Sequence, residues 1–227
     1  MKKTVRGWII RAAAAVFLLA GNPSVTEAQE IGVSVPGDQT VVLERADRAR
    51  VRGDTAAPIR IVEISDFECP YCARFYSEVY RALDSLYVRS GLARYVWISF
   101  PNSSHPRAWP AIEAAFCAGA AGHFWEMHDI LFDRREQWAA ADDPNALFIT
   151  WAVEAGIERE SFGECLRNDQ TAPLQVRDYE SAIRAGVAST PFFVVGDSVA
   201  IRGAVPLETF RSAVDSVLVL RGITPPR

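Results

Sequence analysis

The sequence predicts an α/β fold in which a block of helices interrupts a small sheet. Strand-like runs lie at 59–64 and 95–100, separated by one helical stretch, and strand signals return at 191. Between these two halves, from about 105 to 185, every signal is helical. A stretch of roughly 80 residues is far too long for a loop, so we interpret it as a helical subdomain inserted into a small α/β core.

The N-terminus has the pattern of a secretory signal peptide over residues 1–28. Three basic residues occur within the first six, an apolar stretch is strongest at 12–20, and small residues precede Gln29. The apolar stretch is short for a membrane span and Arg11 interrupts it, although an uncleaved membrane anchor stays open. We therefore expect a periplasmic or secreted protein, in a compartment where disulfides persist.

Charge and composition argue against some partners. Without residues 1–28 the balance moves from 24 basic and 28 acidic residues to 20 and 27, a net charge of −7. All of the remaining basic residues are arginine. A mildly acidic surface disfavours binding to nucleic acid or to an anionic membrane.

Residues 29–57 are expected to form an N-terminal extension before the core. Apolar residues alternate around Pro36-Gly37, which favours an edge strand. The charged run from Glu44 to Arg52 is most simply a solvated surface.

The first half of the core is predicted as strand, helix and strand. Ile59 to Ile64 indicates a buried strand, and Cys69 to about Ser90 a helix that Gly91 ends. A second strand follows from Tyr95 to Phe100. Two strands joined by a helical crossover are expected to pair in parallel.

The second half is predicted as a hairpin followed by a helix. Pro191 to Val195 is strand-like, Gly196-Asp197 is a turn signal, and Ser198 to Ile201 is strand-like again. Apolar residues at helical spacing from Leu207 to Leu218 then indicate a closing amphipathic helix.

The pattern with the clearest chemistry is Cys69-Pro70-Tyr71-Cys72, directly after the first strand. Two cysteines in the first turn of a helix can form and break a disulfide. Pro70 suits the first helical position, and the free N–H groups there stabilise a thiolate. Cys69 is therefore the expected attacking and leaving sulfur, and Cys72 the resolving one. The alternatives are a permanent disulfide or half of a metal site.

With these residues the chain resembles the DsbA-like thiol–disulfide oxidoreductases, the exported branch of the thioredoxin superfamily. The matching segments are Ser65 to Cys72, His105-Pro106, Phe124 to Phe132, and Gly186 to Phe193. The resemblance implies a thioredoxin fold, with its core at 58–104 and 186–221 and a helical insertion at 105–185. It also implies that Cys69 and Cys72 form a redox-active disulfide, that no further cofactor is needed, and that Pro191 is a cis-proline beside the pair.

Two more residues are expected to tune the sulfurs. Strand alternation places Glu63 on the inward face with Ile61, and the family often holds a buried acid there. A buried carboxylate with a raised pKa could exchange the proton of Cys72. An edge-exposed glutamate is the alternative. By the resemblance, Thr190 before the cis-proline would face the sulfurs.

Cys117 and Cys165 form the second pair, in two helices of the insertion. An even cysteine count in an exported chain favours a structural disulfide between them, and two buried thiols are the alternative. No metal site is expected, because His123 and His128 are five apart and point away from each other on a helix. His105 precedes Pro106 and is interpreted as an exposed loop residue.

The direction of catalysis is predicted from the size of the N-terminal extension and from the residues beside Cys69. Isomerases of this superfamily usually carry a separate dimerisation domain, and residues 29–57 look too short for one. We therefore expect a monomeric dithiol oxidase that serves exported client proteins and is reset by a membrane redox partner. Tyr71 replaces the histidine of strongly oxidising members, and Glu68 places a negative charge beside Cys69. The alternatives are a reductase or isomerase and, from another class, a peptide-binding chaperone with a structural disulfide.

Overall fold

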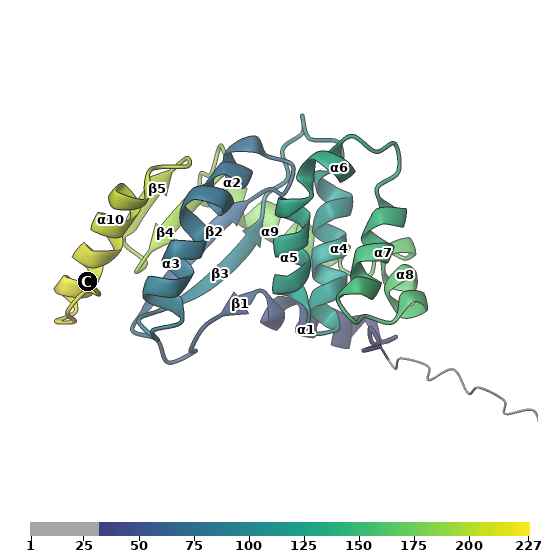
Figure 1. Cartoon of the computed structure of the whole chain (residues 1–227), viewed down its shortest axis with the longest axis horizontal. Coiled ribbons are helices and arrows are strands. Elements are labelled where there is room, and N and C mark those ends of the chain that lie inside the picture. Colours follow the sequence, from purple (N-terminus) through teal and green to yellow (C-terminus); the bar gives the residue numbers. More distant parts are fainter. Residues whose placement is uncertain (1–31) are drawn as a thin grey trace, which may run out of the picture. The chain divides into compact units, whose positions relative to one another are not determined.

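A computed structural model describes residues 32–227 (Figure 1). The predicted signal peptide, and the question of its cleavage, lie outside the described residues. The five-stranded sheet has the order β1-β3-β2-β4-β5. Its strands are β1 Val51–Arg52, β2 Ile59–Ser65, β3 Ala93–Ser99, β4 Phe192–Val195 and β5 Val199–Arg202. The pair β2–β3 is parallel and the other pairs are antiparallel, which confirms the expected crossover and hairpin.

The N-terminal extension differs from its prediction, because its main element is a helix, α1 Gln39–Ala49, rather than an edge strand. The side chain of Asp38 caps it by accepting hydrogen bonds from two backbone N–H groups. Val42 and Ala46, four residues apart, are its buried residues, and α1 packs against helix α4 (Ala108–Ala120). The valine alternation before it forms only an isolated bridge, between Val33 and Ile157.

The charged run from Glu44 to Arg52 is partly buried, which differs from the predicted solvated surface. Arg50 is buried, with 5% of its surface exposed. Its guanidinium pairs with the buried carboxylate of Asp178 and with Asp47 at 2.5 Å. A buried arginine needs such partners, since an unpaired charge in the interior would be very costly.

One continuous helical stretch runs from Pro70 to Val88 and covers one face of the sheet (Figure 1). Its parts are α2 Pro70–Phe75, the π-helical turns η1 Tyr76–Tyr80 and η2 Asp84–Val88, and α3 Arg81–Leu83 between them. Gly91 follows with φ +75°, a left-handed conformation that suits glycine at the end of a helix. The predicted helix after the cysteine pair is thus present.

Six helices fill the stretch between β3 and β4. They are α4, α5 Phe124–Asp133, α6 Arg135–Ala139, α7 Asn145–Glu154, α8 Arg159–Arg167 and α9 Ala172–Arg184. Helix α4 lies at the centre of this group and is buried over almost its whole length. A disulfide between Cys117 and Cys165, with the Cα atoms 5.9 Å apart, joins α4 to α8. No helix among residues 32–227 has the length and apolar character that crossing a bilayer requires.

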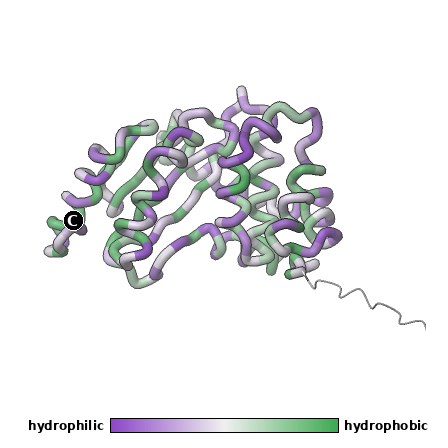
Figure 2. Tube along the Cα trace, viewed as in Figure 1, coloured by the Kyte–Doolittle hydropathy of each residue, from purple (hydrophilic) through white to green (hydrophobic). Residues whose placement is uncertain are grey.

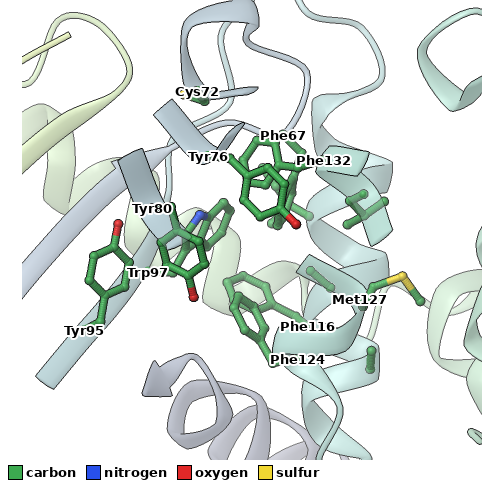
Figure 3. Close-up of a cluster of buried hydrophobic side chains, with 14 of the residues drawn as sticks. Phe67, Cys72, Tyr76, Tyr80, Tyr95, Trp97, Phe116, Phe124, Met127 and Phe132 are labelled. Atoms are coloured by element: carbon green, nitrogen blue, oxygen red, sulfur yellow. The ribbon is translucent and has the colours of Figure 1, made fainter. Parts of the chain in front are cut away.

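The core between the sheet and the helical block is largely aromatic. Figure 3 shows Phe67, Tyr76, Tyr80, Trp97, Phe116 and Phe124 gathered there. Phe67 stacks on Trp97 at 4.5 Å between ring centroids, and buried His128 contacts Phe67 edge-on at 5.7 Å. At the other end of the sheet α10 Leu207–Leu220 packs with Phe210 and Val214 inward, and hydrophobic and hydrophilic segments alternate along it (Figure 2). This confirms the closing amphipathic helix.

Candidate active site at the start of helix α2

The candidate redox pair, Cys69 and Cys72, lies where strand β2 leads into helix α2. Cys69 is the N-cap residue of α2, in an extended conformation with φ −66° and ψ 123°, and Pro70 occupies the first turn. Cys72 is one turn further in and has no exposed surface, whereas Cys69 keeps 4%. Both are present as thiols. The geometry therefore makes Cys69 the sulfur nearer to solvent.

The two sulfurs have opposite electrostatic environments. The pKa of Cys69 is lowered to about 5, first because the Cys72 side chain hydrogen-bonds to its sulfur. Burial opposes this, while the Thr190 side chain and the backbone of Cys72 and Tyr71 add further hydrogen bonds that favour the thiolate. The pKa of Cys72 lies well above its usual range because of its burial, and the neighbouring Cys69 and Glu63 charges act in the same direction. Near neutral pH, Cys69 is the thiolate and Cys72 the thiol.

A proline loop meets the pair from the far half of the sequence. The Thr190-Pro191 peptide bond is cis. When Cys69 is protonated, its thiol donates a hydrogen bond to the Thr190 carbonyl oxygen, with 3.7 Å between sulfur and oxygen. Strand β4 begins at Phe192, which pairs with Ile64 of β2, so the loop lies at the end of the sheet from which the chain continues to Cys69.

Glu63 lies inside the core, on the inward face of β2 with Ile61. Only 1% of it is exposed. Its Oε2 accepts a 2.6 Å hydrogen bond from the Tyr95 hydroxyl, and Oε1 has no hydrogen-bond partner among the described residues. Burial raises the pKa of Glu63, and the Tyr95 hydrogen bond partly offsets this. The carboxyl group is therefore able to hold a proton near Cys72.

His105 lies in a loop, as predicted, but it is only partly exposed because its ring pairs with a buried carboxylate. Its Nδ1 lies 2.6 Å from Oδ2 of buried Asp66, and 19% of its side chain is exposed. Asp66 also accepts hydrogen bonds from the backbone N–H groups of Glu68 and Asn102. The pair ties the start of the helical insertion to the segment just before Cys69. Because 39 positions separate the two residues, their contact leaves no pattern in the sequence.

Glu68 is buried beside Cys69, and its contacts are with the helical insertion. Its carboxylate accepts a 2.7 Å hydrogen bond from the backbone N–H of Arg107. Its carbonyl oxygen accepts a 2.8 Å bond from Nε of Arg135. These contacts fix the backbone that leads into the N-cap, a role that sequence reasoning did not assign to any of the three residues.

Tyr71, between the two cysteines, is 56% exposed. The Arg74 guanidinium lies over its ring, 5.3 Å from the centroid. Beside them a pocket of about 390 Å³ opens next to the proline loop. Its lining includes Tyr71, Arg74, Thr190, Arg202 and Val205. The two arginines were not among the predicted site residues.

The second cysteine pair lies away from this site. Besides binding each other, Cys117 and Cys165 lie with Glu113 in a buried group whose ligand atoms are all within 4.8 Å. Since the two sulfurs share a disulfide, neither is available as a thiolate. Burial is the main reason that the pKa of Glu113 is raised to about 7.

Comparison with known proteins gives a family and several relatives. Residues 45–216 match a family model described as Thioredoxin. A solved structure of Wolbachia pipientis alpha-DsbA1 superposes with a TM-score of 0.67 at 21% identity, over 75% of this chain and 91% of that one. A putative protein-disulfide oxidoreductase of Rickettsia conorii is 24% identical over 174 residues, 76% of this chain and 61% of the relative.

Other relatives are named as antiporters and are much longer than this chain. The Na⁺/H⁺ antiporter NhaA 3 of Salinispora tropica is 34% identical over 181 residues, which are 79% of this chain. The match spans only 26% of the antiporter's own length. The chain therefore corresponds to about a quarter of such a protein.

Proposed function

The chain belongs to the thioredoxin family, and from this we propose that it is an exported protein thiol–disulfide oxidoreductase working as a dithiol oxidase. The observation that carries the proposal is the opposed pair of sulfurs at the start of α2. Cys69 has a pKa lowered to about 5, and Cys72 one well above its usual range. A stabilised thiolate on Cys69 favours the reduced pair, so the Cys69–Cys72 disulfide tends to oxidise other thiols.

In the proposed reaction a client thiolate attacks Sγ of Cys69 in the oxidised protein. The Cys69–Cys72 bond breaks, a mixed disulfide forms between the client and Cys69, and Cys72 leaves as a thiolate that takes up a proton. A second client thiolate then attacks the client sulfur of the mixed disulfide. Cys69 leaves as a thiolate, which its low pKa makes easy, and the client gains the disulfide. Two electrons pass from the client to the protein.

Glu63 supports the proton transfer. When Cys72 leaves, its thiolate is buried and needs a proton at once. Glu63 is buried too, its pKa is raised by burial, and one of its oxygens has no partner in the described chain. We assign it the role of proton donor to Cys72 in oxidation and of acceptor in the reverse direction.

The proline loop is the proposed place for the client backbone. The Thr190 carbonyl lies 3.7 Å from the Cys69 sulfur, and the loop leads directly into strand β4. An extended client segment lying along Thr190 would present its cysteine to Cys69. Main-chain pairing of this kind accepts many sequences, as a general oxidase requires.

Localisation and partners are part of the same proposal. The signal-peptide pattern of residues 1–28 supports export, and the Cys117–Cys165 disulfide suits an oxidising compartment. Because each cycle leaves the pair reduced, an oxidant must restore the disulfide, and we assign that role to a membrane redox partner. The protein would act as a monomer.

Two assays test the proposal. The oxidised protein should form disulfides in a reduced, unfolded client whose refolding depends on them, and it should reduce insulin only weakly. Strong insulin reduction with poor oxidation would instead favour the reductase or isomerase. Inactivity in both assays would favour a peptide-binding chaperone. The Cys69→Ala variant is the control, because it should keep the fold and the surrounding surface but lacks the attacking sulfur.

A further inference from the structure

A pocket with two arginines lies beside the reactive sulfur because of how the strands are registered. Ile64 of β2 pairs with Phe192 of β4, and Phe192 pairs with Arg202 of β5. Arg202 therefore lies at the end of the sheet where β2 leads to Cys69 and where the Thr190-Pro191 loop ends. Figure 1 shows β5 and α2 reaching the same end of the sheet.

The positive charge in this pocket is uncompensated. Its lining, which includes Tyr71, Arg74, Thr190, Arg202 and Val205, contains no acidic residue. Arg74 donates to the Ala204 carbonyl at 3.1 Å, and Arg202 lies over the Phe192 ring at 5.6 Å. Within residues 32–227 neither guanidinium forms a salt bridge. This contrasts with a chain whose net charge is −4.

The groove on the other side of α2 lacks this bias. It is lined by Arg74, Arg134 and Arg135 but also by Asp133 and Glu136. Arg134 pairs with Glu154 at 2.8 Å, and the acidic residues Asp133 and Glu136 line the same groove as Arg135. The uncompensated charge is therefore on the Thr190 side, where the proposed client segment would lie.

We propose that this pocket binds an acidic side chain of the client, located within two or three residues of the reacting cysteine. The inference rests on the proposed function, since it concerns the segment whose thiolate attacks Cys69. A guanidinium binds a carboxylate through two parallel hydrogen bonds, which gives orientation as well as attraction. The exposed ring of Tyr71 and the side chain of Val205 supply apolar contact for the rest of the segment. Acidic clients are thus preferred over basic ones.

The test uses two peptides that differ only in charge. Each has one cysteine, flanked within three positions by either two glutamates or two lysines. The rate of mixed-disulfide formation with the oxidised protein is measured by stopped flow at about 20 mM and about 500 mM salt. Each rate is divided by that peptide's rate with a neutral small disulfide, because flanking acids raise the thiol pKa and slow its intrinsic reaction.

Two charge-reversal variants complete the design. Arg202→Glu places a negative charge in the pocket. Arg45→Glu makes the same charge change on an exposed residue of α1. Figure 1 shows helix α1 on the opposite side of the molecule from α2. Circular dichroism of each variant verifies that it is folded. Oxidation of dithiothreitol by the unaltered protein shows separately whether the protein is an oxidant at all.

We expect the glutamate peptide to react about tenfold faster than the lysine peptide at low salt, with the ratio approaching one at high salt. Arg202→Glu should reverse the preference, and Arg45→Glu should keep it. Equal normalised rates for the two peptides, or a preference that Arg202→Glu leaves unchanged, would overturn the inference while leaving the oxidase function in place. Failure to oxidise dithiothreitol would count against the proposed function itself.

Discussion

The Tyr95 hydroxyl and the Glu63 carboxylate form a buried hydrogen bond of 2.6 Å in the core beneath Cys69 and Cys72. The bond occupies Oε2 of Glu63 and leaves Oε1 without a partner in the described part of the chain. Tyr95 also holds the pKa of Glu63 lower than burial alone would place it. The relationship therefore sets both the position of the acid and the pH at which it gives up its proton.

Replacing Glu63 with Gln should slow the steps in which Cys72 gains or loses a proton. We expect about a 100-fold loss in the rate at which Cys72 resolves a mixed disulfide, a usual contribution of a positioned acid or base. Attack by the Cys69 thiolate should change little, because Cys69 has other stabilising contacts. Rapid-quench kinetics separate the two steps, and equal slowing of both would contradict the assignment.

A matched variant, Tyr95→Phe, keeps the acid and removes its hydrogen bond. Since that bond lowers the pKa of Glu63, its loss should raise the pKa further. Resolution needs Glu63 as a proton acceptor, so the pH profile of this step should move to higher pH while its plateau persists. A plateau lost as completely as in Glu63→Gln would mean that Tyr95 acts in some other way.

The sequence predicted the position of Glu63 but not its partner. Alternation along β2 was enough to place Glu63 inward with Ile61. Tyr95 pairs with Ile61 across the sheet, two residues along the strands from the Glu63–Trp97 pair and on the same face. Its contact with Glu63 therefore depends on the parallel register of β2 and β3. Hydrophobic pattern gives the faces of strands, whereas register is fixed only when the whole sheet assembles.

The same reasoning explains the wrong predictions. Arg50 and His105 were judged exposed because charged and polar residues usually are. Arg50 is instead buried against Asp178, and His105 is only partly exposed because it pairs with Asp66. Helix α1 was missed because the apolar alternation around Pro36-Gly37, which runs into the helix at Val41 and Leu43, suggested a strand. Its burial depends on contact with α4, which lies on the far side of β2 and β3 in the sequence.

The reduced protein should titrate near pH 5 through Cys69. As the pH is lowered, thiolate absorbance at 240 nm, measured against the oxidised protein, should fall with a midpoint near that value, and the signal should be missing in Cys69→Ala.

The stability of the reduced protein should depend on pH for the same reason, because the pKa of Cys69 in the folded protein lies below the ordinary value of about 8.5. Thiolate formation therefore stabilises the reduced form fully above about pH 8.5, and this contribution declines as the pH falls through 5. The melting temperature of the reduced protein should fall accordingly relative to the oxidised one, and a midpoint above pH 7 would contradict the lowered pKa of Cys69.

Cys72→Ala should trap mixed disulfides between Cys69 and client proteins, because the resolving thiol is gone. Cys69→Ala should trap almost none. The largest contribution to the low pKa of Cys69 is its hydrogen bond with Cys72, so Cys72→Ala should also raise the Cys69 pKa. Non-reducing gels and the 240 nm titration measure the two effects. Equal trapping by both variants would refute the division of labour.

Removing the second disulfide should affect stability rather than chemistry. Cys117 and Cys165 are 48 positions apart. Closing a loop of about 50 residues stabilises a protein by roughly 4 kcal/mol in the chain-entropy model. Replacing both cysteines with alanine should lower the melting temperature clearly and leave thiol oxidation nearly intact. Two titratable thiols in the unfolded, unreduced protein, beyond those of the active site, would show that the bridge does not form.

Tyr71→His should make the disulfide a stronger oxidant at mildly acidic pH. A protonated imidazole would lie beside the Cys69 thiolate and stabilise the reduced form, and every 30 mV of higher potential corresponds to about 1.4 kcal/mol. Arg74, over the ring at 5.3 Å, would repel that proton and so confine the effect to pH values below the usual histidine pKa of about 6.5. Equilibration with glutathione at pH 6 and pH 8 measures the potential, and Tyr71→Phe is the control that changes the ring without adding a cation. A potential that is unchanged at pH 6, or equally raised in Tyr71→Phe, would show that the thiolate is not tuned electrostatically through this position.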